Sequence, residues 1–141
     1  MGKGCIKGMI LDEVYDFFRT LPDARLSVEE IVVNAGFTGV LLEDGRAGVA
    51  MNIRSANTVT EAGLESLRRR VGHNAMELAG EVFGSDRLAC SAGVASLSAL
   101  SQPYLNEAFL ASHGLTVKAA GFARILAEDI PPESRGCFIS W

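Results

Sequence analysis

The stretch 37-FTGVLLEDGRAGVAM-51 decides the fold. Its central Asp44-Gly45 is the preferred pair for a tight type I′ hairpin turn. Apolar and small residues stand on both sides of that pair, as they do in a half-buried sheet. We therefore predict two antiparallel strands, Phe37 to Glu43 and Arg46 to Ile53, joined by a two-residue turn.

A two-residue turn fixes the register of this hairpin. Glu43 then lies opposite Arg46, an ion pair worth a few tenths of a kcal/mol, and Val40 lies opposite Val49. One face of the predicted hairpin carries Thr38, Val40, Leu42, Ala47, Val49 and Met51. The opposite face carries Leu41 and the small residues Gly39, Gly48 and Ala50, which would allow another element to pack very close.

Upstream of the hairpin, the spacing of the apolar residues changes. Val28 to Asn34 is short and rich in β-branched residues, which predicts a strand. Before it, the spacing predicts a helix over roughly residues 9–21, with one apolar face. That helix ends at Leu21, because a residue before proline disfavours the helical region. These elements make a three-stranded meander preceded by a helix.

Downstream of the hairpin, Thr58 and Glu61 match the capping box that starts a helix. Gly72 is expected to bend or divide the helical segment that follows. The pair Gly84-Ser85 predicts a C′ glycine followed by a new N-cap. The apolar residues of this segment keep helical spacing through Leu64, Leu67, Val71, Leu78 and Val82.

The next predicted helix, residues 86–100, carries almost only small side chains between Ala89 and Ala99. Such a helix can approach another backbone closely, so we expect it to be central and buried. Pro103 stops it. The predicted class is therefore α+β, with a three-stranded antiparallel meander packed against helices.

The chain has 141 residues, which fits one domain of about 100–200 residues. We expect a single α+β domain, 1–141, with a core over about 9–105 and a C-terminal extension over 106–141. That extension contains a further helical candidate, Leu115 to Ala127. Its apolar end, Phe138 to Trp141, is expected to dock on the core or on a partner.

Charge and cysteine content restrict the class of protein. The net charge of −4 repels a phosphate backbone, and the basic cluster Arg68-Arg69-Arg70 would not form one stripe on a helix, so we expect no nucleic-acid partner. We also expect no membrane association, because no apolar run or signal peptide is visible. Three widely spaced cysteines do not resemble a disulfide framework, which favours a reducing compartment and hence the cytoplasm.

No nucleotide-binding loop and no closely spaced metal motif is present. Candidate site residues are therefore isolated polar groups. Asn34, Asn52 and Arg54 stand at or just after predicted strand ends, where they could line a ligand site or cap turns. His73 follows the glycine at the helix break and could serve as a ligand-binding group, a metal ligand or a surface histidine. Cys90 could be a soft metal ligand or a small buried apolar residue.

Three stretches carry a family resemblance: 31-IVVNAGFTGV-40, 44-DGRAGVA-50 and 91-SAGVASLSAL-100. They resemble the N-terminal domain of uncharacterised prokaryotic proteins described as "putative heavy-metal chelation". The resemblance implies the fold of the enolase N-terminal domain and, as cofactor, a transition metal. Typical members carry a second, Rossmann-like domain, which we expect to be missing here because the sequence ends at Trp141. Ser98 stands where the family often has asparagine, a departure in the small-residue helix.

Three classes of function follow from these observations. The first is a binding and assembly domain that forms a homo-oligomer or joins a separate Rossmann-like partner protein, and that handles a metal or small ligand. The second is an enzyme with a site at the strand ends, using Arg54, His73 or Cys90. The third is a structural subunit of a larger complex, with no ligand of its own.

Overall fold

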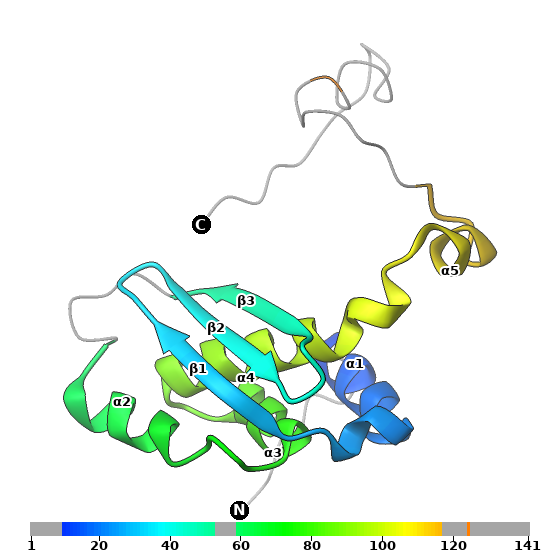
Figure 1. The fold of residues 1–141 in the computed structure, drawn as a ribbon. Coiled ribbons are helices and arrows are strands. Elements are labelled where there is room, and N and C mark those ends of the chain that lie inside the picture. The colour runs from blue at the N-terminus through cyan, green and yellow to red at the C-terminus, as the bar shows by residue number, and fades with distance from the viewer. Residues whose placement is uncertain (1–9, 53–58, 117–123, 125–141) are drawn as a thin grey trace, which may run out of the picture. The chain divides into compact units, whose positions relative to one another are not determined.

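The computed structural model describes residues 10–52, 59–116 and 124, and its contacts divide the chain into two compact units, residues 1–104 and 105–141. Over its described residues, the first unit contains four α-helices, three strands and three short 3₁₀ turns, whose arrangement is drawn in Figure 1. In chain order they are α1 (Ile10–Arg19), η1 (Pro22–Arg25), β1 (Val28–Val33), β2 (Phe37–Leu42), β3 (Ala47–Met51), α2 (Glu61–Arg68), α3 (Ala75–Ala79), η2 (Gly80–Phe83), α4 (Arg87–Ser101) and η3 (Gln102–Tyr104).

The three strands form one antiparallel sheet in the order β1-β2-β3, so the predicted meander and the α+β class are confirmed. Helix α4 packs on one face of this sheet, and α3 packs against α4 (Figure 1). The covered face carries Thr38, Val40 and Leu42 of β2 and Gly48 and Ala50 of β3, all of them buried. The core of the unit therefore lies between the sheet and these helices.

The predicted register of the hairpin is wrong by one residue. Val40 lies opposite Gly48, and the backbone N–H of Leu42 donates to the carbonyl of Arg46 at 2.8 Å. The loop therefore holds three residues, 43–45, and Gly45 adopts a φ of 88°, as the last residue of a three-residue hairpin loop does. Because a slip of one residue exchanges the two faces of a strand, β3 turns Gly48 and Ala50 toward the core.

The predicted ion pair between Glu43 and Arg46 is also wrong. A carboxylate oxygen of Glu43 accepts a hydrogen bond from the backbone N–H of Ser27 at 3.0 Å. The Arg46 guanidinium instead contacts Asp44 at 2.7 Å and Asp23 at 3.1 Å. It also donates to the carbonyl of Leu100, at the end of α4, at 3.4 Å. Arg46 thus ties the hairpin tip to η1 and to α4.

Helix α4 is central and buried, as predicted. A Cβ built on Gly48 would overlap the backbone of α4 at Ala95 and Ala99, so strand and helix meet backbone to backbone. On the opposite side, a Cβ on Gly93 would lie 3.1 Å from the carbonyl oxygen of Leu78 in α3. The small side chains of α4 therefore allow close approach to the sheet and to α3 at once.

Two predicted helix caps lie at other residues. Thr60, not Thr58, caps α2 by accepting from the N–H of Gly63, and Thr58 lies outside the described residues. Asp86, not Ser85, caps α4. A carboxylate is as good an N-cap as a hydroxyl, so the sequence pattern did not separate the neighbouring candidates.

The predicted break at Gly72 is confirmed. Gly72 has a φ of 81°, in the left-handed region that favours glycine, and it separates α2 from α3. The side chain of Asn74 then starts α3 by accepting from the N–H of Met76 at 2.7 Å. Its Nδ2 donates to the carbonyl of Ala24 at 2.7 Å, which joins the start of α3 to η1.

Helix α1 occupies most of the range predicted for it and buries Phe18 against the core. The rings of Phe17 and Phe18 meet Tyr104 of η3 edge to face, with centroids 5.7 and 5.9 Å apart. None of the helices within the described ranges is long and apolar enough to cross a membrane.

The second unit is described over residues 105–116 and 124. It contains α5 (Glu107–Ser112), which Asn106 caps by accepting from the N–H of Phe109 at 2.9 Å. The helix predicted over 115–127 and the apolar end, Phe138 to Trp141, fall almost wholly outside the described residues.

Candidate functional site

Asn34 and Asn52, two of the predicted ligand-binding residues, meet at one end of the sheet. Nδ2 of Asn52 donates to the backbone carbonyl of Asn34 at 2.8 Å, and Oδ1 of Asn52 accepts from the Thr38 hydroxyl at 2.6 Å. Oδ1 of Asn34 accepts from the N–H groups of Gly36 and Phe37 at 2.8 and 2.7 Å. Both side chains thus hold the β1–β2 turn and the end of β3 together.

The environments of these two asparagines differ. Asn52 is only 3% exposed, whereas Asn34 is exposed. A buried side-chain amide bonded to the protein on both of its polar atoms has a structural role already. Arg54, the third residue predicted for this end of the sheet, lies outside the described residues. A ligand site at the strand ends stays a prediction.

His73 lies at the other end of β1. The N–H of Val28 donates to the His73 carbonyl at 2.9 Å, and Ser27 forms a bridge with Asn74 next to it. Val28 and Asn34 are six residues apart in the sequence, about 20 Å along an extended strand. The exposed His73 ring is 4.0 Å from the Glu77 carboxylate. The structure therefore does not bring His73 together with the two asparagines.

Cys90 lies in the first turns of α4 and faces η2. Its Sγ lies 3.2 Å from the carbonyl oxygen of Glu81 and 3.4 Å from that of Gly84, so the thiol is placed to donate. Burial, followed by the negative charges of Asp86 and Glu81, raises the pKa of the Cys90 thiol. The metal-binding form of cysteine is the thiolate, which these surroundings disfavour.

A protein metal site needs three or four ligands that converge on one point. Over residues 10–52, 59–116 and 124, no three His, Cys, Asp or Glu side chains are grouped so that they could hold a metal ion. The predicted ligands His73 and Cys90 lie on different elements and contact different groups. The described residues therefore do not form a metal site by themselves.

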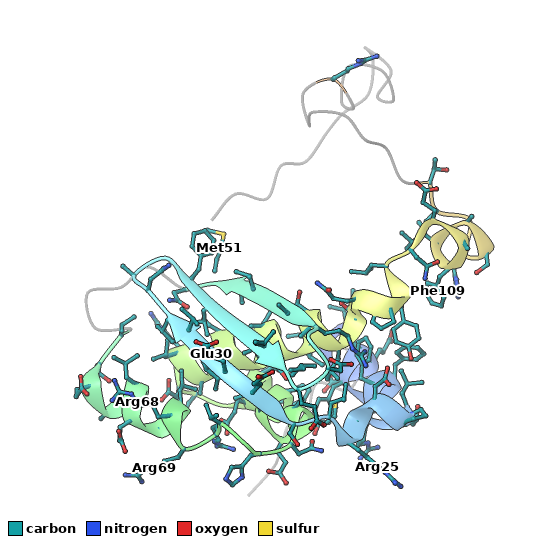
Figure 2. All side chains as sticks on the ribbon, viewed as in Figure 1. Arg25, Glu30, Met51, Arg68, Arg69 and Phe109 are labelled. Carbon is teal, nitrogen blue, oxygen red and sulfur yellow. The ribbon has the colours of Figure 1, made fainter. Side chains whose placement is uncertain are left out.

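A surface that the sequence analysis did not identify lies on the side of the sheet turned away from α3 and α4. We call it the open sheet face. Glu30 pairs with Leu41 there, and Phe37 pairs with Met51. Figure 2 shows Met51 pointing away from the helices. The full set is Glu30 and Val32 of β1, Phe37, Gly39 and Leu41 of β2, and Ala47, Val49 and Met51 of β3.

Four large apolar side chains of this face are strongly exposed: Val32 by 56%, Phe37 by 48%, Val49 by 60% and Met51 by 65%. The outward side of an antiparallel sheet is normally polar where water covers it. Seven of the eight residues of the open sheet face are apolar. The predicted register did not reveal this apolar face, because it placed Val49 and Met51 on the same side of the sheet as Val40. A three-residue loop ending at Gly45 was the signal that could have revealed it.

The arginines of the cluster Arg68-Arg69-Arg70, at the end of α2, pair with neighbouring carboxylates. Arg68 lies 3.3 Å from Glu61 and 3.4 Å from Glu65, and Arg69 lies 3.6 Å from Glu65. Arg70 pairs with Glu81. Arg68 and Arg69 project from the helix into solvent (Figure 2). Their positive charge is therefore compensated locally, as in an ordinary solvated helix face.

Comparisons with known proteins give a family and a fold. The model of the family DUF4213, described as "Putative heavy-metal chelation", matches residues 17–101, which confirms the resemblance. A crystal structure of a protein of unknown function from the DUF364 family of Desulfitobacterium hafniense DCB-2 is similar, with a TM-score of 0.53 and 19% identity. The similarity covers 84% of this chain and 45% of that protein, and at this identity it shows the fold alone. No curated protein matches the chain.

Proposed function

Because this chain belongs to the DUF4213 family, "Putative heavy-metal chelation", we propose that it is a binding and assembly domain. The open sheet face receives a partner protein, and the helices behind the sheet hold that face rigid. The observation that carries this proposal is the exposure of four large apolar side chains on one sheet face. Contiguous apolar surface of this kind marks interaction sites.

The length of the similar solved protein supports a partner. This chain spans 45% of it, so more than half of that protein lies outside the shared fold. The family resemblance implies a Rossmann-like second domain in longer members. We propose that a separate Rossmann-like protein, or a further domain, takes the corresponding place on this chain. A homo-oligomer is the alternative partner.

A second candidate function, handling of a transition metal, is supported by the family's description. The described residues provide no group of three ligands, so a site would need residues from elsewhere in the chain or from the partner. Elemental analysis of tag-free protein purified without added metal tests this function. Near-stoichiometric metal that falls in Cys90→Ser or His73→Ala would support it, and protein without metal would count against it.

The enzymatic alternative has less support from the geometry. Its candidate groups lie in two places, with the asparagines at one end of β1 and His73 at the other. Cys90 is bonded to backbone carbonyls instead of facing either end. Catalysis needs reacting groups within hydrogen-bond reach of each other, and these residues are not so arranged.

Site-specific photo-crosslinking tests the binding role of the open sheet face. A photoreactive amino acid replaces Val49 in the full chain, and a control chain carries it at Ser66, which is exposed on α2. We expect one protein species to be linked from Val49 and not from Ser66, and Met51→Lys to remove the link.

Equal products from Val49 and Ser66, or no product from Val49, would contradict the proposed binding role. A product with twice the mass of the chain would identify the partner as a second copy, which would select the homo-oligomer over the Rossmann-like partner.

A further inference from the structure

We infer that the open sheet face takes a different protein whose apolar surface is edged by lysine or arginine, not a second copy of this chain. This inference rests on the proposed binding role of that face. It names the chemistry of the partner and follows from the one-sided distribution of charge on the face.

The acidic side of the face is β1. Glu30 lies on the open sheet face opposite Leu41, and Glu29 lies beside it where the β1 register shifts. Both are exposed, and Figure 2 shows Glu30 on the sheet. Toward β3 the face carries Ala47, Val49 and Met51 and no charge. The face is therefore apolar on one side and acidic on the other.

None of the eight residues of the open sheet face is a cation. The basic residue of the hairpin, Arg46, has a side chain only 16% exposed and bonded to Asp23 and Asp44. A partner that covers the whole face, Val32 and Leu41 included, also dehydrates Glu30. Covering a carboxylate without a counter-charge is unfavourable, so the partner has to supply one.

Within the described residues, the open sheet face of a second copy stacked on it does not supply that charge. Stacked sheets keep their strands within about 30° of each other. A two-fold axis in the interface then places β1 either over the partner's β1 or over the partner's β3. The first arrangement runs the two β1 strands antiparallel and sets Glu30 toward the Val32 end of the other β1, and the second sets it against Ala47, which lies at the level of Glu30 in the sheet. Neither arrangement brings a cation of the eight residues of the open sheet face to Glu30.

A second copy added at the edge of β3 is excluded by helix packing. Gly48 of β3 meets the backbone of α4 at Ala95 and Ala99, so α4 lies directly under β3. Pairing two β3 edges would set the two strands about 4.8 Å apart. Two packed helices need about 8–10 Å between their axes, so the two α4 helices would overlap.

A matched pair of synthetic peptides tests the inference. Both form amphipathic helices of about 18 residues with the same leucine face. Lysines flank the leucines in one peptide, and glutamates flank them in the other. The full chain is titrated with each peptide, and amide chemical shifts report the binding site. We expect the lysine peptide to bind at least about fivefold more tightly, with shifts at Phe37, Val49 and Met51.

The variant Glu30→Lys should remove or reverse this preference, since it changes the sign of the charge on the face. Glu13→Lys is the matched control, because Glu13 is exposed on α1 and the net charge changes equally. Equal binding of the two peptides, or a preference that survives Glu30→Lys, would overturn the inference and leave the binding role intact.

Failure of both peptides to bind would also overturn the inference. The crosslinking experiment at Val49 tests the proposed binding function independently of the peptide titration. A dimer in sedimentation that is lost in Val49→Lys would show that the partner is a second copy and would equally overturn it.

Discussion

Gly48 is the residue at which the sheet and α4 come closest. A methyl group there would overlap backbone atoms of Ala95 and Ala99, which cannot move aside as a flexible side chain can. We expect Gly48→Ala to lower the free energy of unfolding by about 3 kcal/mol or more, through overpacking. Chemical denaturation of the full chain measures this change.

Gly39 provides the matched control, because it lies on the neighbouring strand and on the open sheet face. A Cβ at Gly39 would lie 3.9 Å from its nearest atoms, an ordinary contact. Gly39→Ala should therefore change the free energy of unfolding by less than about 1 kcal/mol. Similar losses in the two variants would show that close packing does not explain the requirement for glycine.

Cys90 should be a slow thiol. Burial and the carboxylates of Asp86 and Glu81 raise its pKa, so at neutral pH it holds its proton and little thiolate is present to react. In a chain carrying Cys5→Ser and Cys137→Ser, alkylation of Cys90 should be slower in the native protein than in the unfolded one. The rate should still rise above the pH at which an ordinary thiol is fully ionised. Equal native and unfolded rates would contradict this.

For single residues, the sequence indicated which polar side chains would lie close together, but not which hydrogen bonds they would form. Asn34 and Asn52 stand out in the sequence as polar groups at strand ends, and the structure does bring them together. Their hydrogen bonds to each other and to Thr38 depend on which backbone groups face them. That information arises only when three strands are assembled, so no local pattern contains it.

At the scale of elements, the hairpin was likewise predicted only in part. Its two strands were predicted, but its register was not, because Asp44-Gly45 fits a two-residue loop as well as a three-residue loop. The choice is made by packing: only the observed register places Gly48 on the same face as Val40 and Leu42, where α4 packs. Helix α4 was predicted within one residue at each end, since small residues between a cap and a proline mark it locally.

The hairpin tip should respond to acid. Burial opposes ionisation of Asp44, but hydrogen bonds from the side chain and backbone of Arg46 prevail and hold its pKa below the usual value. A lowered pKa adds stability that is present above the unfolded pKa, about 3.9, and is lost as the pH falls through the folded pKa. We expect Asp44→Asn to be less stable than the parent at pH 6.

The same variant should be closer to the parent at pH 2, where the parent has lost the charge of Asp44. Denaturation curves at both pH values measure the difference. Asp16→Asn is the control, because Asp16 pairs with Arg19 on the exposed side of α1. A stability gap for Asp44→Asn that stays constant between the two pH values would contradict the assignment.

At the scale of the whole molecule, the division after Tyr104 predicts that residues 1–104 fold by themselves. A chain ending at Tyr104 should keep one cooperative unfolding transition. A chain ending at Gln102 should be less stable by about 1 kcal/mol or more, because it loses the edge-to-face contacts of Tyr104 with Phe17 and Phe18. Thermal and urea denaturation measure both chains, and loss of the cooperative transition after Tyr104 would contradict the division.

At this scale the α+β class was predictable, because a meander followed by helices is encoded in the spacing of apolar residues. The family was predictable from the resemblance of three sequence stretches, and its model matches residues 17–101. The open sheet face was not, since its composition depends on the register of one hairpin. Val49 and Met51 have the same hydropathy on either side of a sheet. Their meaning for function appears only once the side covered by α4 is known.

Asn52 also determines how the sheet opens. It joins the end of β3 to the β1–β2 turn, so all three strand ends there depend on one side chain. Amide hydrogens of Asn34 and Asn52, which donate to Phe37 and Gly36, should exchange with solvent deuterium at one common rate. Amide hydrogens at the hairpin tip should exchange at rates that differ from this common rate. In Asn52→Ala the common exchange rate should rise, and the strands should separate first at the end of the sheet that holds the β1–β2 turn.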